Sequence, residues 1–209
     1  ICARDDVRRV HVAATTALFA ACERAGVRRV IHISAIGASR AGPTAFSRSK
    51  AEAEDDLAGR YVDWAILRPG LVLAPSAFGG TAMLRGLASL PFVTPLVAAD
   101  ARIQVVSVDD VAETVARCMA PKAKLNVKWD VAHPRVLTLG VLVAALRGWL
   151  GFPPARTRAL PRAFGVAIGA IADVLGYLGW RSPARSTALR QLAAGVIGEP
   201  TPWIEATRI

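Results

Sequence analysis

The feature that most constrains the fold is a regular alternation of strand-like and helix-like patterns across residues 1–134. Short apolar runs at residues 29–34, 62–67, 103–108 and 128–131 indicate buried strands. Around and between them, apolar side chains recur at helical spacing over residues 7–25, 45–58, 79–90 and 109–120. Because strands that alternate with helices usually form right-handed crossovers, this pattern predicts an open α/β fold with a mostly parallel sheet.

The pattern changes after residue 134, where only helical periodicity remains and predicts a helical C-terminal extension over residues 135–209. Its most apolar stretch is residues 164–180, which contain one charged residue, Asp173, and four glycines. A membrane-spanning helix needs about 20 apolar residues, so this shorter, interrupted stretch favours a helix packed on the main domain. A helix that faces a membrane surface or a partner is the alternative.

The chain is strongly basic, with a formal net charge of +10 that is concentrated in residues 135–209, where nine basic and three acidic side chains occur. An arginine-rich exposed surface accounts for this charge without any partner, whereas attraction to an anionic partner is the more specific interpretation. No basic stretch interleaved with aromatic residues and no zinc-finger spacing occurs, so nucleic acid is not an expected partner. Because residues 135–209 are also apolar, the partner they favour is a membrane surface or a membrane protein.

The cysteine and histidine content excludes two further classes of protein. The three cysteines form no CxxC pair, which excludes a disulfide scaffold and a cysteine-built zinc site. Without metal-ligand spacing among His11, His32 and His133, we expect no metal site. Reduced cysteines indicate a cytoplasmic protein, and the basic, apolar C-terminal residues allow a position at the inner face of a membrane.

The strongest set of candidate functional residues lies between Ser34 and Lys50. Ser34 ends a predicted strand, so its hydroxyl is expected at the carboxyl edge of the sheet, where open α/β sheets bind ligands. Phe46 and Lys50 are four residues apart on one predicted helix and therefore share a face. The strand at residues 62–67 is followed by a proline and a glycine, which deliver irregular backbone to the same edge.

Four segments in this order resemble the short-chain dehydrogenase/reductase family, in its extended or atypical branch. The matching segments are residues 32–38 (HISAIGA), 46–54 (FSRSKAEAE), 63–70 (DWAILRPG) and 104–112 (QVVSVDDVA). The bacterial members that the chain resembles most are NAD(P)-binding proteins similar to the nucleotide-binding accessory subunit of respiratory complex I. The resemblance implies a doubly wound, Rossmann-type parallel sheet, binding of NAD or NADP, and a homodimer formed through residues 7–25 and 45–58.

The resemblance also implies roles for individual residues. In such enzymes the tyrosine of a YxxxK pair is the acid or base, and the lysine contacts the nicotinamide ribose and lowers the pKa of the tyrosine. By position, Ser34 is the hydroxyl that orients the substrate carbonyl, and Lys50 is the ribose contact and charge partner. The backbone expected to line the nicotinamide pocket is that of Pro69, Gly70, Leu71 and Val72.

Phe46 is the first departure from the family pattern, because it stands at the tyrosine position and has no ionisable proton. Either another hydroxyl replaces the phenol, or the protein binds the nucleotide without reducing a substrate. The hydroxyls available for this replacement are those of Ser47, Ser49, Thr44 and Tyr61.

The second departure is that the family's glycine-rich phosphate loop, G-x-x-G-x-x-G, has no match in the chain. The absence of this loop indicates that the first three strands of the dinucleotide-binding half are missing, so residues 1–3 are expected to be the end of the fourth strand. We therefore expect a fragment of a longer protein. In this fragment, residues 1–134 form a partial NAD(P)-binding Rossmann-like domain that lacks its first strands, and residues 135–209 form the extension.

These observations predict an NAD(P)-linked oxidoreductase or epimerase that acts on a hydrophobic carbonyl or a sugar-nucleotide substrate. The alternative is a non-catalytic NAD(P)H-binding scaffold or sensor that docks on a membrane protein through residues 135–209. Phe46 favours the alternative, whereas Ser34 and Lys50 favour the enzyme. Two simpler interpretations stay open: Ser34 as an ordinary strand-end hydroxyl, and Lys50 as a solvated lysine paired with Glu54.

Overall fold

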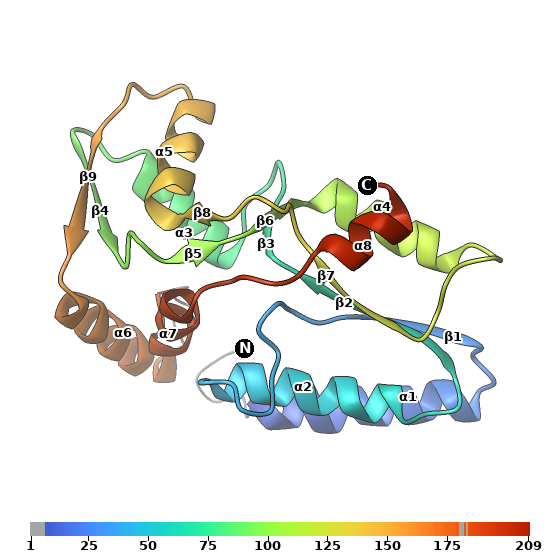
Figure 1. Ribbon diagram of the computed structural model, residues 1–209. Coiled ribbons are helices and arrows are strands. Elements are labelled where there is room, and N and C mark those ends of the chain that lie inside the picture. Colours follow the sequence, from blue (N-terminus) through green and yellow to red (C-terminus); the bar gives the residue numbers. More distant parts are fainter. Residues whose placement is uncertain (1–6, 180–181, 183) are drawn as a thin grey trace. The chain divides into compact units, whose positions relative to one another are not determined.

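The computed structural model describes residues 7–179, 182 and 184–209 (Figure 1). The chain forms two compact units, each built from separate stretches of sequence. Within the described residues, the sheet unit comprises residues 7–72, 104–134 and 197–209, and the arginine-rich unit comprises residues 73–103 and 135–196. Residues 135–209 thus contribute to both units, and a separate domain with those bounds stays a prediction. The strand end expected at residues 1–3 lies outside the described residues.

Three parallel strands form the main sheet of the sheet unit, in agreement with the predicted parallel α/β fold. They are β1 (Arg29–Ile33), β2 (Asp63–Pro69) and β7 (Val127–Val131), in the order β1-β2-β7. Ala65 of β2 is paired with Ile31 on one side and with Val127 on the other. A separate pair consists of β3 (Leu71–Leu73) and β6 (Val105–Ser107).

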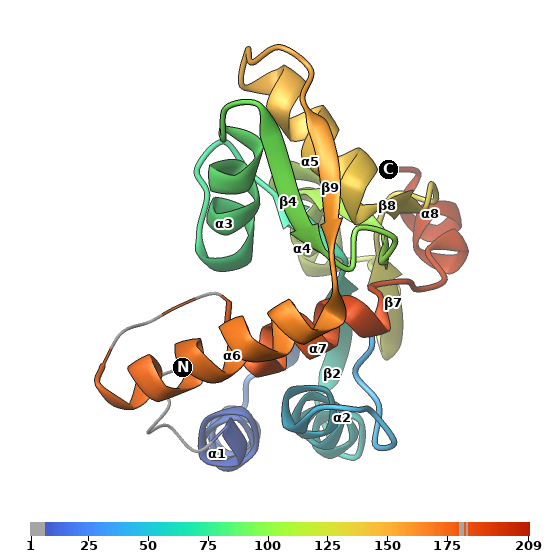
Figure 2. The same ribbon diagram turned by 90° about the vertical axis from the view of Figure 1, so that its left-hand side faces the viewer.

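Helices cover both faces of this sheet, as Figures 1 and 2 show. On one face lie η1 (Arg9–Ala14), a π-helical segment that continues into α1 (Thr15–Arg24), and α2 (Ala45–Ala58). On the other face lie α4 (Val108–Met119) and α8 (Thr201–Thr207). Parallel strands require crossover connections, and α2 supplies the one between β1 and β2.

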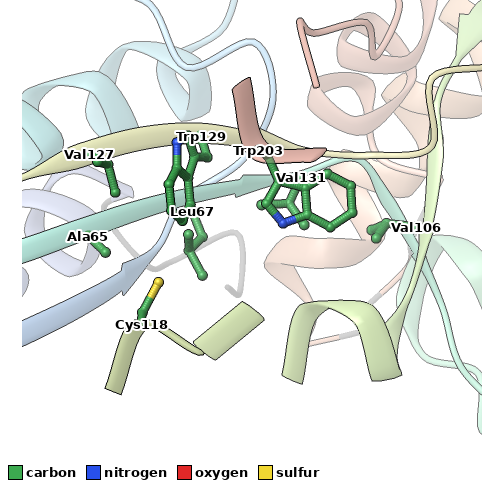
Figure 3. Packing of buried hydrophobic residues seen from close by; sticks show 8 residues of the cluster. All are labelled: Ala65, Leu67, Val106, Cys118, Val127, Trp129, Val131 and Trp203. Atoms are coloured by element: carbon green, nitrogen blue, oxygen red, sulfur yellow. The ribbon is translucent and has the colours of Figure 1, made fainter. Parts of the chain in front are cut away.

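The two faces of the sheet carry separate apolar clusters, because successive side chains of a strand point to opposite sides. Ile66 packs with Phe19 and Leu57 on the side of α1 and α2. The cluster on the side of α4 and α8 is shown in Figure 3 and consists of Ala65, Leu67, Val106, Cys118, Val127, Trp129, Val131 and Trp203. Trp203 Nε1 also donates a hydrogen bond to Thr114 Oγ1 at 2.9 Å, which ties α8 to α4.

Helix α2, which carries Phe46 and Lys50, has the bounds that the sequence predicts. Thr44 precedes the helix in an extended conformation, and its side chain accepts a hydrogen bond from the Ser47 N–H at 3.0 Å. This contact satisfies one of the backbone donors that a helix N-terminus leaves unpaired. Gly59 follows the last helical residue. Local capping chemistry therefore determines where Lys50 lies relative to the sheet.

The arginine-rich unit contains β-structure that the sequence analysis did not predict. Its strands form two pairs: β4 (Val93–Val97) with β9 (Arg156–Leu160), and β5 (Arg102–Ile103) with β8 (Leu137–Thr138). The prediction of helices alone over residues 135–209 is wrong at β8 and β9. Four of the five residues of β9 are exposed, so no apolar alternation marks this strand in the sequence.

The helices of the arginine-rich unit are α3 (Gly79–Ala88), α5 (Leu139–Trp149), α6 (Arg162–Tyr177) and α7 (Ser186–Ala194). Helix α6 corresponds to the apolar stretch predicted at residues 164–180. Within the described part of the chain, none of the helices combines the length and the hydropathy that crossing a membrane requires.

Candidate active site

The carboxyl ends of the three parallel strands meet at one edge of the sheet, and Ser34 lies at this edge. Ser34 directly follows β1, and its N–H donates a hydrogen bond to Leu67 O of β2 at 2.7 Å. Gly70 directly follows β2, and its N–H donates to Val131 O of β7 at 3.0 Å. The predicted positions of Ser34 and Gly70 at a shared edge therefore agree with the backbone pairing.

The Ser34 hydroxyl is buried, with 6% of the residue exposed, and no hydrogen-bond partner for Oγ is found among the described residues. The hydroxyl lies close enough to the Glu54 carboxyl to help lower the pKa of Glu54, although the two groups are not aligned as a regular hydrogen bond. A buried hydroxyl that lacks a partner carries an unfavourable desolvation cost. A ligand oxygen at this edge would remove that cost by accepting from Ser34 Oγ.

Lys50 brings a positive charge to the same end of β1. It is half-buried on α2, and its Nζ donates a hydrogen bond to Ile33 O at 3.3 Å, one residue before Ser34. Burial lowers the pKa of the Lys50 ammonium, although the nearby Glu54 carboxylate acts in the opposite direction. The structure thus places the Lys50 ammonium at the backbone of the residue before Ser34, at the end of the same strand.

Glu54 is a buried charged residue beside the site, which the sequence analysis considered only as a partner of Lys50. Its side chain is fully buried, and it forms ion pairs with Arg68 of β2, at 2.5 Å between Oε2 and Nη2, and with Lys128 of β7, at 3.2 Å. Burial alone would raise the pKa of Glu54, but hydrogen bonds from Arg68 and Lys128 and the charge of Arg68 hold it below its usual value. Glu54 therefore anchors α2 to two strands, one helical turn after Lys50.

Phe46 packs beside a histidine that the sequence analysis did not connect with the site. The ring of His11, from η1, contacts the Phe46 ring edge-on with 5.4 Å between centroids. His11 Nδ1 is also 3.1 Å from Ser49 Oγ, within hydrogen-bond distance. Burial and the charge of Lys50 lower the pKa of His11, which favours the neutral imidazole. A π-helical segment often occurs at functional positions in helices, and η1 is what brings His11 to this point.

The hydroxyls considered as replacements for the missing phenol are engaged or distant from the edge. Ser47 Oγ donates to Gly37 O, and Ser49 Oγ donates to Phe46 O at 3.0 Å. Thr44 caps α2 as described above. Tyr61 is 98% exposed and precedes β2, so it lies at the amino end of that strand, opposite the edge with Ser34. No simple substitution of one hydroxyl for another is therefore visible among these four residues.

The segment after β2 presents apolar side chains rather than backbone donors. The N–H groups of Gly70 and Leu71 are taken by Val131 O and Gln104 O, at 3.0 and 2.9 Å. A Cβ at position 70 would lie 2.6 Å from Gln104 O, so only glycine permits this close approach. Pro69 is buried, and Leu71 and Val72 are half-buried. These residues can line a flat, apolar ring such as nicotinamide, but Gly70 and Leu71 do not offer free N–H donors to it.

The chemistry of this edge fits the ribose and nicotinamide portion of a dinucleotide. Ser34 supplies a buried hydroxyl, Lys50 supplies an ammonium that can donate to ribose hydroxyls, and the segment after β2 supplies an apolar lining. Among the described residues, no three His, Cys, Asp or Glu side chains are grouped so that they could hold a metal ion.

Comparison with known families identifies the class of protein. The sequence profile of the NAD(P)H-binding family matches residues 3–122, which is more than half of the chain. The chain therefore belongs to the NAD(P)H-binding family, and the predicted NAD(P) cofactor is confirmed at this level. No curated protein matches the sequence significantly.

Solved structures with the same fold include nucleotide-sugar epimerases and a quinone reductase. A nucleoside-diphosphate-sugar epimerase from Staphylococcus aureus is 15% identical with a TM-score of 0.71, covering 100% of this chain and 71% of that chain. An NADPH-dependent quinone oxidoreductase from Escherichia coli, crystallised with NADPH, is 18% identical with a TM-score of 0.69. The match covers 93% of this chain and 65% of that chain. UDP-glucose 4-epimerase from Thermotoga maritima, with UDP-glucose, is 16% identical with a TM-score of 0.59. The match covers 73% of this chain and 58% of that chain.

These similarities agree with the resemblance to atypical short-chain dehydrogenases/reductases and with the Rossmann-type fold. At such low identity they establish the fold alone. The chain spans only 58% of the length of the Thermotoga epimerase.

Proposed function

We propose that the protein is an NAD(P)-dependent oxidoreductase or epimerase, with Ser34 and Lys50 in its active site. The observation that carries this proposal is the position of Lys50 Nζ, 3.3 Å from the carbonyl oxygen of Ile33, the residue that precedes the buried Ser34 at the carboxyl end of β1. A lysine that binds the ribose has to reach this strand end, and Lys50 does so. Membership in the NAD(P)H-binding family supplies the cofactor class.

In this proposal each residue has a defined task. A bound nicotinamide supplies the hydride donor or acceptor. Lys50 Nζ donates to ribose hydroxyls, and its positive charge stabilises negative charge that develops on the substrate oxygen. Ser34 Oγ donates a hydrogen bond to that oxygen and orients the carbonyl. Leu71 and Val72 exclude water from the ring.

Phe46 cannot hold or release a proton, so protonation of the substrate oxygen would proceed from water through the Ser34 hydroxyl. General acid catalysis by a positioned side chain typically contributes 10²–10⁴-fold. We therefore propose a slow enzyme. The quinone reductase and the sugar epimerases among the structural neighbours support a carbonyl, quinone or sugar-nucleotide substrate.

A fluorescence titration of the full-length protein with NADH and NADPH tests the proposal. Replacing Lys50 with alanine removes a charge-assisted hydrogen bond worth roughly 1.5–3 kcal/mol, so the Kd should rise about tenfold or more. Lys122→Ala is the matched control, because Lys122 is an exposed lysine outside the site, and its Kd should stay unchanged.

The outcomes separate the enzyme from a non-catalytic binding module. Unchanged affinity in Lys50→Ala would remove Lys50 from the cofactor site and contradict the proposal. Normal binding by the parent, with no turnover of quinones, aldehydes or sugar nucleotides, would instead favour the non-catalytic module that Phe46 suggests.

A further inference from the structure

The buried face of helix α6, in the arginine-rich unit, consists of small residues. Its buried positions include Gly165, Gly169 and Ala172, which recur every three or four residues and so share one face. A Cβ at position 165 would lie 2.7 Å from Val97 Cγ1, and one at position 169 would lie 3.0 Å from Ser186 Cα. The glycines therefore bring the helix close to β4 and to the start of α7.

Most large apolar residues of α6 and its C-terminal cap are exposed. We call the following residues the outer face of α6: Phe164 (56% exposed), Val166 (72%), Ile171 (60%), Val174 (62%) and Leu178 (79%). Most helices bury such side chains and expose polar ones. A contiguous set of exposed apolar side chains on a protein surface marks an interaction site.

The net charge of the arginine-rich unit indicates the kind of partner that would bind the outer face of α6. Residues 73–103 and 135–196 contain ten arginines and two aspartates, a net charge of +8, so the longer remainder of the chain carries only +2. One of the two aspartates, Asp173 on α6, is paired with Arg185 at 3.0 Å. Arg156, Arg158 and Arg162 are exposed and lie just before or at the start of α6.

We propose that the outer face of α6 docks on the surface of an anionic lipid bilayer, with the helix lying in the plane of the headgroups. At 16 residues, α6 is about 24 Å long, which is shorter than a hydrocarbon core of about 30 Å. Apolar side chains that enter the headgroup boundary, together with flanking arginines, are the two forces that hold interfacial helices.

Charge complementarity favours a bilayer over a second copy of the chain. Two copies joined through α6 would bring two arginine-rich units together, and their like charges would repel. Anionic headgroups supply the opposite charge instead. This inference concerns the arginine-rich unit and is independent of the NAD(P) site in the sheet unit.

Flotation with lipid vesicles tests the proposal. The purified protein is mixed with phosphatidylcholine vesicles, with or without phosphatidylglycerol, and centrifuged in a density gradient. We expect it to float with the anionic vesicles only, and less at high ionic strength because salt screens charge. Ile171→Asp combined with Val174→Asp should lower the partition coefficient at least about tenfold, because both side chains leave the apolar layer.

Two controls make the result specific. Met119→Asp replaces an exposed apolar residue of α4 in the sheet unit by aspartate, where Met119 is 66% exposed. This variant should float like the parent, and the single variant Ile171→Asp, which adds the same charge, should float less than Met119→Asp. Circular dichroism and the NADPH titration should be unchanged in all variants, because Ile171 and Val174 are exposed. Failure of the parent to float, or unchanged flotation of the double variant, would overturn the proposal. Self-association that the double variant abolishes, in a parent that does not float, would overturn it in favour of a second copy.

Discussion

At the scale of single residues, Phe46 separates this protein most clearly from the enzymes that it resembles. The rest of the local arrangement is retained: Lys50 follows four residues later, and Ser34 lies beside it at the strand end. We expect Phe46→Tyr to raise kcat for carbonyl reduction by about 10²–10⁴-fold, because it places an acid next to the Lys50 ammonium. Steady-state assays on quinones, aldehydes and sugar nucleotides measure this.

Tyr61→Phe is the matched control for Phe46→Tyr, because Tyr61 lies far from the edge. Its removal should leave every rate unchanged. A Phe46→Tyr variant that binds NAD(P)H normally and is no faster than the parent would contradict the catalytic role proposed for Ser34 and Lys50.

His32 predicts a specific pH dependence of stability. Its ring packs edge-on against Phe19, its buried Nε2 has no hydrogen-bond partner among the described residues, and burial, followed by the Lys50 charge, lowers its pKa from 6.5 to about 4. Between these two pKa values the unfolded chain binds the proton more readily than the folded one. The free energy of unfolding should therefore fall as the pH drops from about 6.5 towards 4.

Urea unfolding at pH 7 and pH 5 measures this dependence. Glutamine at position 32 cannot titrate. Between pH 7 and pH 5, the free energy of unfolding of His32→Gln should therefore fall by about 1–2 kcal/mol less than that of the parent. His133→Gln, which alters an exposed histidine, should behave like the parent. If the free energy of unfolding falls equally in the parent and in His32→Gln, His32 does not titrate with a lowered pKa.

At the scale of elements, prediction from the sequence succeeded where local chemistry decides the structure and failed where long-range packing does. Helix α2 was predicted with its correct bounds, because Thr44 and Gly59 mark its ends locally. Strand β9 was missed, because it is specified by pairing with β4, about sixty residues earlier in the chain, and not by its own pattern. The contact between Glu54 and Arg68 was missed for a similar reason. An i,i+4 pair of Glu54 with Lys50 was the local expectation, whereas Arg68, the partner of Glu54, comes from strand β2.

Substitutions at two glycines can test how closely neighbouring elements are packed. A Cβ at Gly70, between β2 and β3, would meet Gln104 O at 2.6 Å, whereas a Cβ at Gly86, inside α3, would meet nothing within 4 Å. Neither glycine has a positive φ. We expect Gly70→Ala to lower the free energy of unfolding by about 1–3 kcal/mol through overpacking. Gly86→Ala should raise it by about 0.5–1 kcal/mol, because alanine favours the helix.

Denaturant unfolding of both variants measures these changes. A neutral or stabilising Gly70→Ala would mean that β2 and Gln104 are less closely packed than the structure describes. Cofactor affinity of Gly70→Ala is a second readout, because Gly70 also belongs to the proposed nicotinamide lining, while Gly86→Ala should bind NAD(P)H like the parent.

At the scale of the whole molecule, the connectivity of the two units could not be predicted from the sequence. Composition changes once, near residue 134, and suggests two successive parts. Along the described part of the chain, from residue 7 onward, the chain passes between the units four times, because residues 73–103 and 135–196 form one unit and residues 197–209 return to the other. The reason is physical: β4 pairs with β9 and β5 with β8, and neither pairing leaves a periodic signal within a single segment.

This connectivity predicts how the chain behaves when it is divided at residue 134. Residues 135–209 alone lack the partners of β8 and β9, and they also lack the core in which Trp203 is buried. We expect this fragment to show no cooperative unfolding transition and little near-ultraviolet circular dichroism, because its apolar faces have nothing to pack against. Refolding an equimolar mixture of residues 1–134 and 135–209 is the control, and it should restore a cooperative transition. If residues 135–209 instead unfold cooperatively by themselves, the extension is a domain of its own, and the pairing of β4 with β9 contributes little to its stability.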